Sequence, residues 1–116
     1  MEKLFYKNNK LIIYNILRQL GLRPNHNGTK FAIKAIQLIL DNNNIIKIKD
    51  IYENISKSTI SFTPEQIRIS IKYAIDLRNE QKSIQNFKKI FNYDYDEEIF
   101  SNKDFLEEIA NILQKI

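Results

Sequence analysis

Apolar residues recur at three- and four-residue spacing along almost the whole chain, and this spacing limits the fold more than any other feature. The first stripe consists of Ile13, Ile16, Leu17 and Leu20. Gly21 follows it, and glycine suits the left-handed backbone that ends many helices. Similar stripes predict helices over residues 29–40, 48–55, 63–78, 84–91 and 101–116. The stripe of the helix over 84–91 consists of Ile84, Phe87 and Phe91, and residues 101–104 resemble a capping box at the start of the last helix. The pattern therefore predicts an all-α fold, a compact bundle of about six helices.

Two short segments leave a second arrangement open within the single domain expected for residues 1–116. Residues 45–49 and 58–62 both alternate apolar and polar side chains, as short β-strands do. If both segments formed strands, the fold would be a winged helix-turn-helix. The polar segment 41–44 favours a turn in either arrangement.

The strongest local signal for a helix start lies at Thr63. Thr63 supplies a capping hydroxyl, Pro64 suits the first helical position, and Gln66 can bond back to the cap. At about 100° per residue, Ile69 lies almost opposite the apolar stripe of this helix, so we expect it to be exposed. The stripe predicted to be buried consists of Ile67, Ile71, Ala74 and Ile75.

Charge is distributed unevenly along the chain. Residues 1–92 hold all but two of the 18 lysines and arginines and only half of the 14 acidic residues, whereas residues 93–116 are acidic. A basic body is typical of a surface that faces a polyanion, and an ordinary solvated surface is the alternative. The chain has no cysteine and no apolar run of membrane-spanning length, which favours a cytoplasmic protein without a membrane partner.

Two consecutive short helices joined by a tight connection predict a helix-turn-helix, with residues 63–78 as the helix that reads double-stranded DNA. A solvated face of a core helix accounts for most of the same residues. The outward side chains favour DNA, because glutamine bonds adenine, arginine or lysine bonds guanine or phosphate, isoleucine meets the thymine methyl group, and tyrosine bonds phosphate. Backbone amides at the helix start offer another phosphate site. The predicted DNA-binding residues are Thr63, Glu65, Gln66, Arg68, Ile69, Lys72 and Tyr73.

The sequence indicates neither an enzyme nor a cofactor site. His26 is the only histidine, and a lone loop histidine is usually structural or solvated. No glycine-rich phosphate loop is present. The acidic residues of segment 94–98 match no metal-binding loop, so a solvated acidic turn is the favoured interpretation.

A helical protein-interaction module is the main alternative function. In that interpretation the last helix, residues 101–116, pairs with another chain. The same surface would serve a homodimer on adjacent DNA sites, so the two interpretations are compatible. The aromatic residues expected to take part are Tyr93, Tyr95, Phe100 and Phe105.

Four stretches in a common order give the chain a resemblance to a known family. They are residues 13–36, residues 63–76 (TPEQIRISIKYAID), residues 90–93 and residues 101–113. In order and spacing they resemble the C-terminal DNA-binding effector domain of the master response regulators that initiate sporulation in endospore-forming Firmicutes. The resemblance implies a six-helix fold, a helix-turn-helix formed by the third and fourth helices, binding to short and often tandem DNA sites, and no enzyme activity.

The chain departs from this family on the face that would read DNA. The family typically has arginine, glutamate, arginine, arginine and histidine where this sequence has Gln66, Arg68, Ile69, Lys72 and Tyr73. The turn before the reading helix is also about one residue longer. These differences predict the same docking mode on a different DNA sequence, or a fold with another use.

A second departure concerns regulation. The family carries a phosphorylatable receiver domain ahead of this one, whereas only about a dozen residues precede the first predicted helix here. If Met1 is the true start, phosphorylation is not the switch, and residues 3–10 form a helix extension or a basic arm. We hypothesise a constitutive transcriptional regulator or accessory protein encoded on a plasmid or another mobile element.

Overall fold

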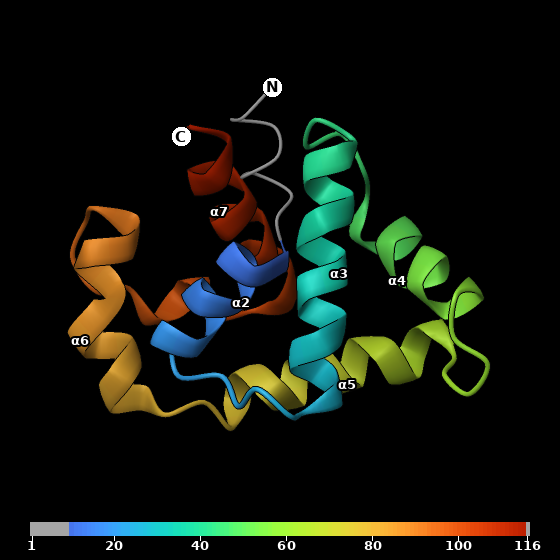
Figure 1. The fold of residues 1–116 in the computed structure, drawn as a ribbon, viewed down its shortest axis with the longest axis horizontal. Helices are drawn as coiled ribbons and strands as arrows, with labels where there is room; N and C mark the ends of the chain where they lie inside the picture. The colour runs from blue at the N-terminus through green and yellow to red at the C-terminus, as the bar shows by residue number, and fades with distance from the viewer. Residues whose placement is uncertain (1–9, 116) are drawn as a thin grey trace.

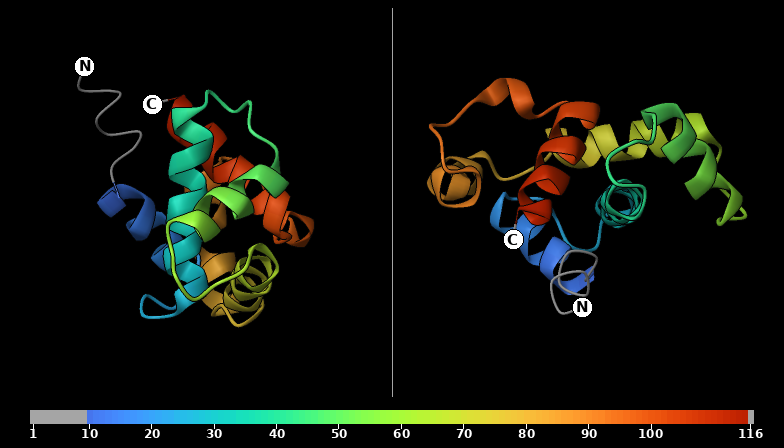
Figure 2. Two further views of the ribbon diagram at one scale, coloured as in Figure 1. Left: turned by 90° about the vertical axis from the view of Figure 1, so that its right-hand side faces the viewer. Right: turned by 90° about the horizontal axis from the view of Figure 1, so that it is seen from above.

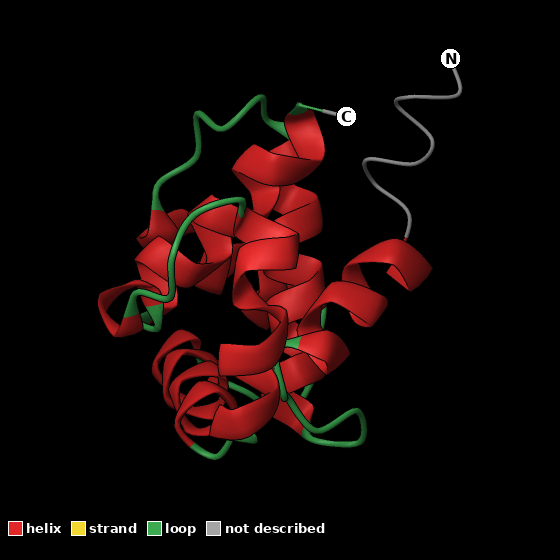
Figure 3. Ribbon diagram, turned by 90° about the vertical axis from the view of Figure 1, so that its left-hand side faces the viewer, coloured by secondary structure: helices red, strands yellow, loops and turns green. Residues whose placement is uncertain are grey.

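Each predicted stripe forms a helix in the computed structural model, which describes residues 10–115 (Figure 1). The elements are α2 (Lys10–Gln19), α3 (Asn27–Asp41), α4 (Ile48–Lys57), α5 (Pro64–Asp76), α6 (Glu80–Phe91), the 3₁₀ helix η1 (Glu97–Ile99) and α7 (Asn102–Gln114). The predicted all-α bundle of about six helices is confirmed for the described residues, which form helices and loops alone (Figure 3). None of these helices is long and apolar enough to cross a membrane.

The winged alternative is wrong, because neither of its two segments forms a strand in the described part of the chain. The end of segment 45–49 already belongs to α4, and segment 58–62 connects α4 to α5. Bonding in that connection is local, since the Ser58 N–H donates to the Ile55 carbonyl oxygen at 3.1 Å. A segment bonded in this way closes a turn and leaves no ladder for a neighbouring strand.

The helices α3, α4 and α5 pack against one another at one end of the molecule. In Figure 1, α5 runs along the base, α3 stands on it, and α4 lies beside both. The helices α2 and α7 cover the other side of α3, and α6 lies at the far end, as the further views in Figure 2 also show. The Cα radius of gyration is 13.3 Å, as expected for a compact fold of about 100 residues.

The core is built from the apolar stripes predicted from the sequence. Along the central helix α3 the whole stripe is buried, and α2, α4 and α5 each bury theirs against it. Removal of these side chains from water is the main term that stabilises the fold. The buried stripe of α3 includes Ala32, Ala35, Ile36 and Ile39.

Left-handed backbone ends two helices where the sequence predicted turns. Gly21 has a φ of +97°, and a Cβ added there would lie 2.3 Å from the Asn79 carbonyl oxygen. Only glycine satisfies both constraints. After α3, Asn43 and Asn44 have φ values of 54° and 63°, a conformation that asparagine tolerates better than most residues.

The predicted stripe of α6 is wrong at one position. Phe87 and Phe91 are buried as expected, but Ile84 remains 50% exposed. Ser83 takes the inward position instead, and its hydroxyl donates to the Leu20 carbonyl oxygen. A buried hydroxyl that bonds a free carbonyl at the end of α2 replaces the apolar contact that periodicity suggested.

The predicted capping box at the start of the last helix is also wrong. Ser101 is the N-cap of α7, but its side chain makes no capping hydrogen bond. The apolar face is confirmed at Phe105, Ile109 and Leu113, which are buried. The predicted end of this face at residue 116 lies outside the described residues, as do residues 3–9 of segment 3–10, which was predicted as a helix extension or a basic arm.

Candidate nucleic-acid interface

The start of α5 is fixed by the capping box that the sequence predicted. The Gln66 N–H donates to the Thr63 hydroxyl at 3.1 Å, and the Thr63 N–H donates to the Gln66 side-chain oxygen at 2.9 Å. Pro64 occupies the first helical position and has no N–H. Of the backbone N–H groups in residues 63–65, the Glu65 N–H is therefore the one that the capping box does not use.

The exposed face of α5 is the one predicted from periodicity. All four residues of the predicted stripe are buried, and the opposite face is open to solvent. On that face Ile69 is 51% exposed and Tyr73 is 57% exposed. Two large, partly apolar side chains one turn apart on a polar helix form a surface suited to contact with another molecule.

The crossing of α3 over α5 depends on a glycine. A Cβ added to Gly28 would lie 1.9 Å from the Ser70 carbonyl oxygen and 2.8 Å from the Ala74 Cβ. Because the first atom is backbone, no side-chain rotation would relieve the contact. The absent side chain thus lets the start of α3 rest directly on the middle of α5, behind its exposed face.

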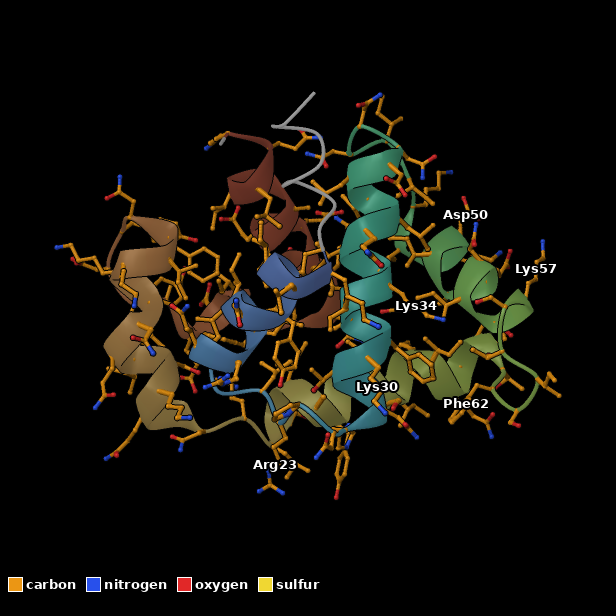
Figure 4. All side chains as sticks on the ribbon, viewed as in Figure 1. Arg23, Lys30, Lys34, Asp50, Lys57 and Phe62 are labelled. Carbon is orange, nitrogen blue, oxygen red and sulfur yellow. The ribbon has the colours of Figure 1, made fainter. Side chains whose placement is uncertain are left out.

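The connection between α4 and α5 is tied to the helices around it. The Ser56 hydroxyl donates to the Phe62 carbonyl oxygen at 2.7 Å. The ring of Phe62 packs edge-on against Phe31 of α3, with 5.0 Å between ring centroids (Figure 4). These contacts fix the angle at which α5 leaves α4, although the tip residue Ile60 is fully exposed.

The basic side chains on the exposed face of α5 are paired with acidic ones. Arg68 is ion-paired with Glu65, which raises the pKa of the Arg68 guanidinium above its ordinary value. Lys72 Nζ lies 3.0 Å from a carboxylate oxygen of Asp76. The face therefore carries two positive and two negative charges, so any strong attraction for a polyanion comes from charges elsewhere.

A shallow groove runs along this face between α5 and the loop that leads into α3. It has a volume of about 490 Å³. We call it the α5 groove. Its lining residues are Asn25, His26, Asn27, Gln66, Ile69, Ser70 and Tyr73.

His26 holds one wall of the α5 groove in place. Its Nδ1 accepts from the Gly28 N–H at 2.9 Å, which makes it the N-cap of α3, and its ring lies 5.6 Å from that of Tyr73. The structural interpretation of this histidine is confirmed, but the sequence placed neither its capping role nor its contact with Tyr73. Histidine is not among the preferred caps, so the prediction began the helix two residues late.

Asn102 at the start of α7 ties the last helix to both α4 and α5. Its side-chain amide donates to the Tyr52 hydroxyl at 3.0 Å and to the Arg68 carbonyl oxygen at 2.9 Å. Burial raises the pKa of Tyr52, so this phenol stays protonated over the ordinary pH range. This link was not predicted from the sequence, because local patterns hold no signal for it.

Arg78, just after α5, is turned inward and does not extend the exposed face. Its guanidinium lies 3.7 Å from the centre of the Phe100 ring and donates to the Ile75 carbonyl oxygen, the Ser83 hydroxyl and the Tyr95 hydroxyl. This basic residue therefore stabilises the junction between α5, α6 and the segment before α7.

The aromatic residues predicted as a pairing surface are largely used inside the molecule. Phe105 is buried, and Phe100 stacks against it with 5.4 Å between centroids. Tyr93 and Tyr95 pack edge-on against Phe87, at 5.4 and 5.1 Å. Since Phe105 is inaccessible, its predicted role in pairing with another chain is wrong.

The acidic segment before α7 forms a local turn. The Asp96 side chain accepts from the Glu98 N–H at 3.0 Å, which caps η1. Among the residues that the structure describes, no group of three or more side chains is arranged to hold a metal ion.

A small helical body that presents one polar, half-exposed helix beside a shallow groove has the form of a helical DNA-binding domain. A family model described as the C-terminal part of the sporulation initiation factor Spo0A matches residues 13–113, and the chain belongs to this family of DNA-binding domains. The resemblance seen in the sequence is thereby confirmed. No curated protein and no solved structure matches the chain.

Proposed function

We propose that the protein binds double-stranded DNA in a sequence-dependent manner through a helix-turn-helix formed by α4, its connection and α5. The observation that carries this proposal is the half-exposed Ile69, which lies in the α5 groove one turn from Gln66 and one turn from Tyr73. An exposed α-helix fits the major groove of B-DNA, which is about 12 Å wide.

Gln66 and Ile69 are the residues proposed to read bases. Glutamine recognises adenine through its side-chain oxygen and nitrogen together. Because the oxygen of Gln66 now accepts from Thr63, reading adenine in this way requires the capping box to open. Ile69 is already exposed and contacts a thymine methyl group without any rearrangement.

Arg68, Lys72 and Tyr73 are proposed to contact guanine or backbone phosphates. Both cations are held in exposed ion pairs, and such pairs contribute little to stability. Exchange of a carboxylate partner for a phosphate therefore takes little energy. The amides at Thr63 and Glu65 are proposed to lie near a phosphate, with the Glu65 amide best placed to donate because the capping box does not use it.

At the cellular level we propose a transcriptional regulator or a DNA-binding accessory protein of a mobile element. The family resemblance implies short and often tandem DNA sites, so a homodimer on such sites is proposed to involve the surface of segment 101–116. Exposed parts of α7 remain for that contact, although its one aromatic residue, Phe105, is buried.

Selection from a pool of randomised duplexes at near-physiological salt tests the proposal. The purified protein is expected to enrich a defined motif, and a repeated motif would reveal the spacing of a dimer. If no motif is enriched, or if retention tracks charge alone, sequence-dependent binding is refuted.

Three substitutions then test whether the exposed face of α5 reads the bases. Ile69→Ala and Gln66→Ala are expected to relax preference at one base position by about 1–3 kcal/mol, whereas Lys72→Ala weakens binding to all sequences alike. Ile84→Ala is a matched control, because this isoleucine of α6 is 50% exposed, against 51% for Ile69. If Ile69→Ala and Ile84→Ala changed the preference for the selected motif equally, α5 would not be the helix that reads the bases.

A further inference from the structure

A second groove with strong positive charge opens at the C-terminal end of α5. It has a volume of about 420 Å³ and lies between the end of α2, the loop before α3 and the start of α6. None of the described residues that line it is acidic. We call it the basic groove, and its charged lining residues are Arg18, Arg23, Arg78 and Lys82.

Three of these four cations are free to meet a ligand. Arg18, Arg23 and Lys82 are exposed, and none of them forms an ion pair within residues 10–115. Figure 4 shows the Arg23 side chain pointing away from the body, below the loop that leads into α3 and on the side of α5. Arg78 differs, because its guanidinium is held by the Phe100 ring and the Ile75 carbonyl oxygen.

The basic groove continues the α5 groove along the same helix face. Tyr73 lines the α5 groove, and Leu77, four residues later and hence one turn further on, lines the basic groove. In the loop before α3, Pro24 lines the basic groove and Asn25 lines the α5 groove. Consecutive residues on both walls thus join the two grooves into one surface.

The length of α5 places the basic groove where a DNA backbone would run. A helix rises about 1.5 Å per residue, so Leu77 lies about 12 Å along the axis from Ile69. The major groove of B-DNA is about 12 Å wide. When the middle of α5 faces base edges, the region beyond Leu77 therefore meets the phosphates at the groove edge.

The basic groove can neutralise DNA phosphates more readily than the exposed face of α5 can. The cations on the exposed face of α5 are each paired with a carboxylate, so that face is close to neutral. Affinity for DNA depends largely on unpaired cations that displace counterions from phosphates. The three exposed cations of the basic groove supply such charges next to the reading helix.

We propose that the basic groove is a second DNA-binding site, in which Arg18, Arg23 and Lys82 hold backbone phosphates that flank the bases read by α5. This inference rests on the proposed function and adds the site from which most of the sequence-independent affinity comes. Arg78 supports the wall of the groove and does not bind the phosphate.

The test uses a short duplex of mixed sequence, since binding to phosphates does not depend on the bases. The dissociation constant is measured over a range of salt concentrations for the wild-type chain and for the triple variant Arg18→Gln, Arg23→Gln, Lys82→Gln. The salt slope is expected to become shallower by about 1 for each phosphate that the variant no longer neutralises. Affinity at physiological salt is expected to fall about fivefold for each of these phosphates.

Lys89→Gln is the matched control, because it removes one exposed positive charge, unpaired among the described residues, in the last turn of α6, at the end of that helix away from α5 (Figure 1). It is expected to leave the slope unchanged, and each single variant of the basic groove is compared with it. All three substituted side chains of the groove are exposed, so the thermal unfolding midpoint is expected to stay close to that of the wild type.

A second measurement locates the binding site on the DNA. Replacing single phosphates of the selected duplex by neutral methylphosphonates is expected to weaken wild-type binding at flanking positions and to have no further effect on the triple variant. Equal sensitivity of both proteins, or a slope equal to that of Lys89→Gln, would overturn the basic groove as a DNA site while sequence selection by α5 still stood. Absence of wild-type binding to any duplex would instead overturn the proposed function, and this inference with it.

Discussion

The two ends of the molecule use their side chains differently. At the α3–α4–α5 end, the buried faces of the helices are mostly aliphatic, with Phe31 and Tyr52 as aromatic members, and the charged side chains on the exposed face of α5 form ion pairs along that helix. At the α6–α7 end, aromatic rings pack around Phe87, with centroid distances from 4.6 to 6.1 Å. Arg78 joins that cluster from the end of α5.

This difference separates side chains that hold the fold from side chains that remain available. The aromatic residues and the arginine of the α6–α7 end are tied into contacts between elements, so their removal affects stability first. Ile69 and Tyr73 on α5 are more than half exposed, so their removal leaves the core intact. Recognition is therefore expected on α5 and on the grooves beside it.

The largest expected effect on stability comes from a substitution at the α3–α4–α5 end, where α3 crosses α5. Gly28→Ala places a methyl group against the Ser70 backbone and is expected to lower the free energy of unfolding by about 3 kcal/mol or more. Denaturant unfolding measures the change. Lys30→Ala, on the exposed side of the same helix, is the control and should stay within about 0.5 kcal/mol of the wild type.

A smaller effect is expected from breaking the junction at the other end. Arg78→Ala removes the contact over Phe100 and three hydrogen bonds, and is expected to cost about 2 kcal/mol of stability. Arg78→Lys keeps the charge but lacks the planar guanidinium, so it should recover less than half of this stability. Full recovery by lysine would show that charge alone, and not this geometry, stabilises the junction.

Asn102→Ala tests the link between the two ends. It removes the donor shared by the Tyr52 hydroxyl and the Arg68 carbonyl oxygen and is expected to lower stability by about 1 kcal/mol. Asn111→Ala changes the same residue type on the same helix, where its side chain makes one long exposed bond of 3.5 Å. Calorimetric unfolding of both variants gives the comparison, and equal midpoints would contradict the link.

The smallest effect concerns alkaline pH at the α6–α7 end. Burial and a hydrogen bond to Glu108 raise the pKa of Tyr93 to about 12 in the folded protein, above its ordinary value of 10.0. A raised folded pKa means that this stabilisation is complete below pH 10 and is lost as the pH rises toward 12. In Tyr93→Phe, the free energy of unfolding should therefore change less between pH 10 and pH 12 than in the wild type. Chemical unfolding at a series of pH values would detect the difference.

The elements of the fold could be predicted from sequence because each rests on local patterns. The capping box at Thr63 and the stripe beginning at Ile67 require only residues within the same helix. The exposure of Ile69 followed from the same helix geometry. The sequence therefore predicted the centre of the candidate site, but not the loop residues that line the groove beside it.

The contacts that the sequence did not predict join residues far apart in the chain. Ser83 is buried because the free Leu20 carbonyl meets it, 63 positions away. Asn102 is bonded to Tyr52 across 50 positions. A periodic pattern holds no information on such partners, so Ile84 was placed inward and Ser101 was given a capping bond that it does not make.

Backbone amide shifts, followed by NMR during titration with a duplex recovered by selection, would show directly whether α5 reads DNA. We predict that the largest shifts occur at Gln66, Ile69 and Tyr73 and in the loop before α3, while the aromatic cluster around Phe87 stays unchanged. Shifts concentrated on α6 and α7, with α5 unaffected, would contradict a reading role for α5.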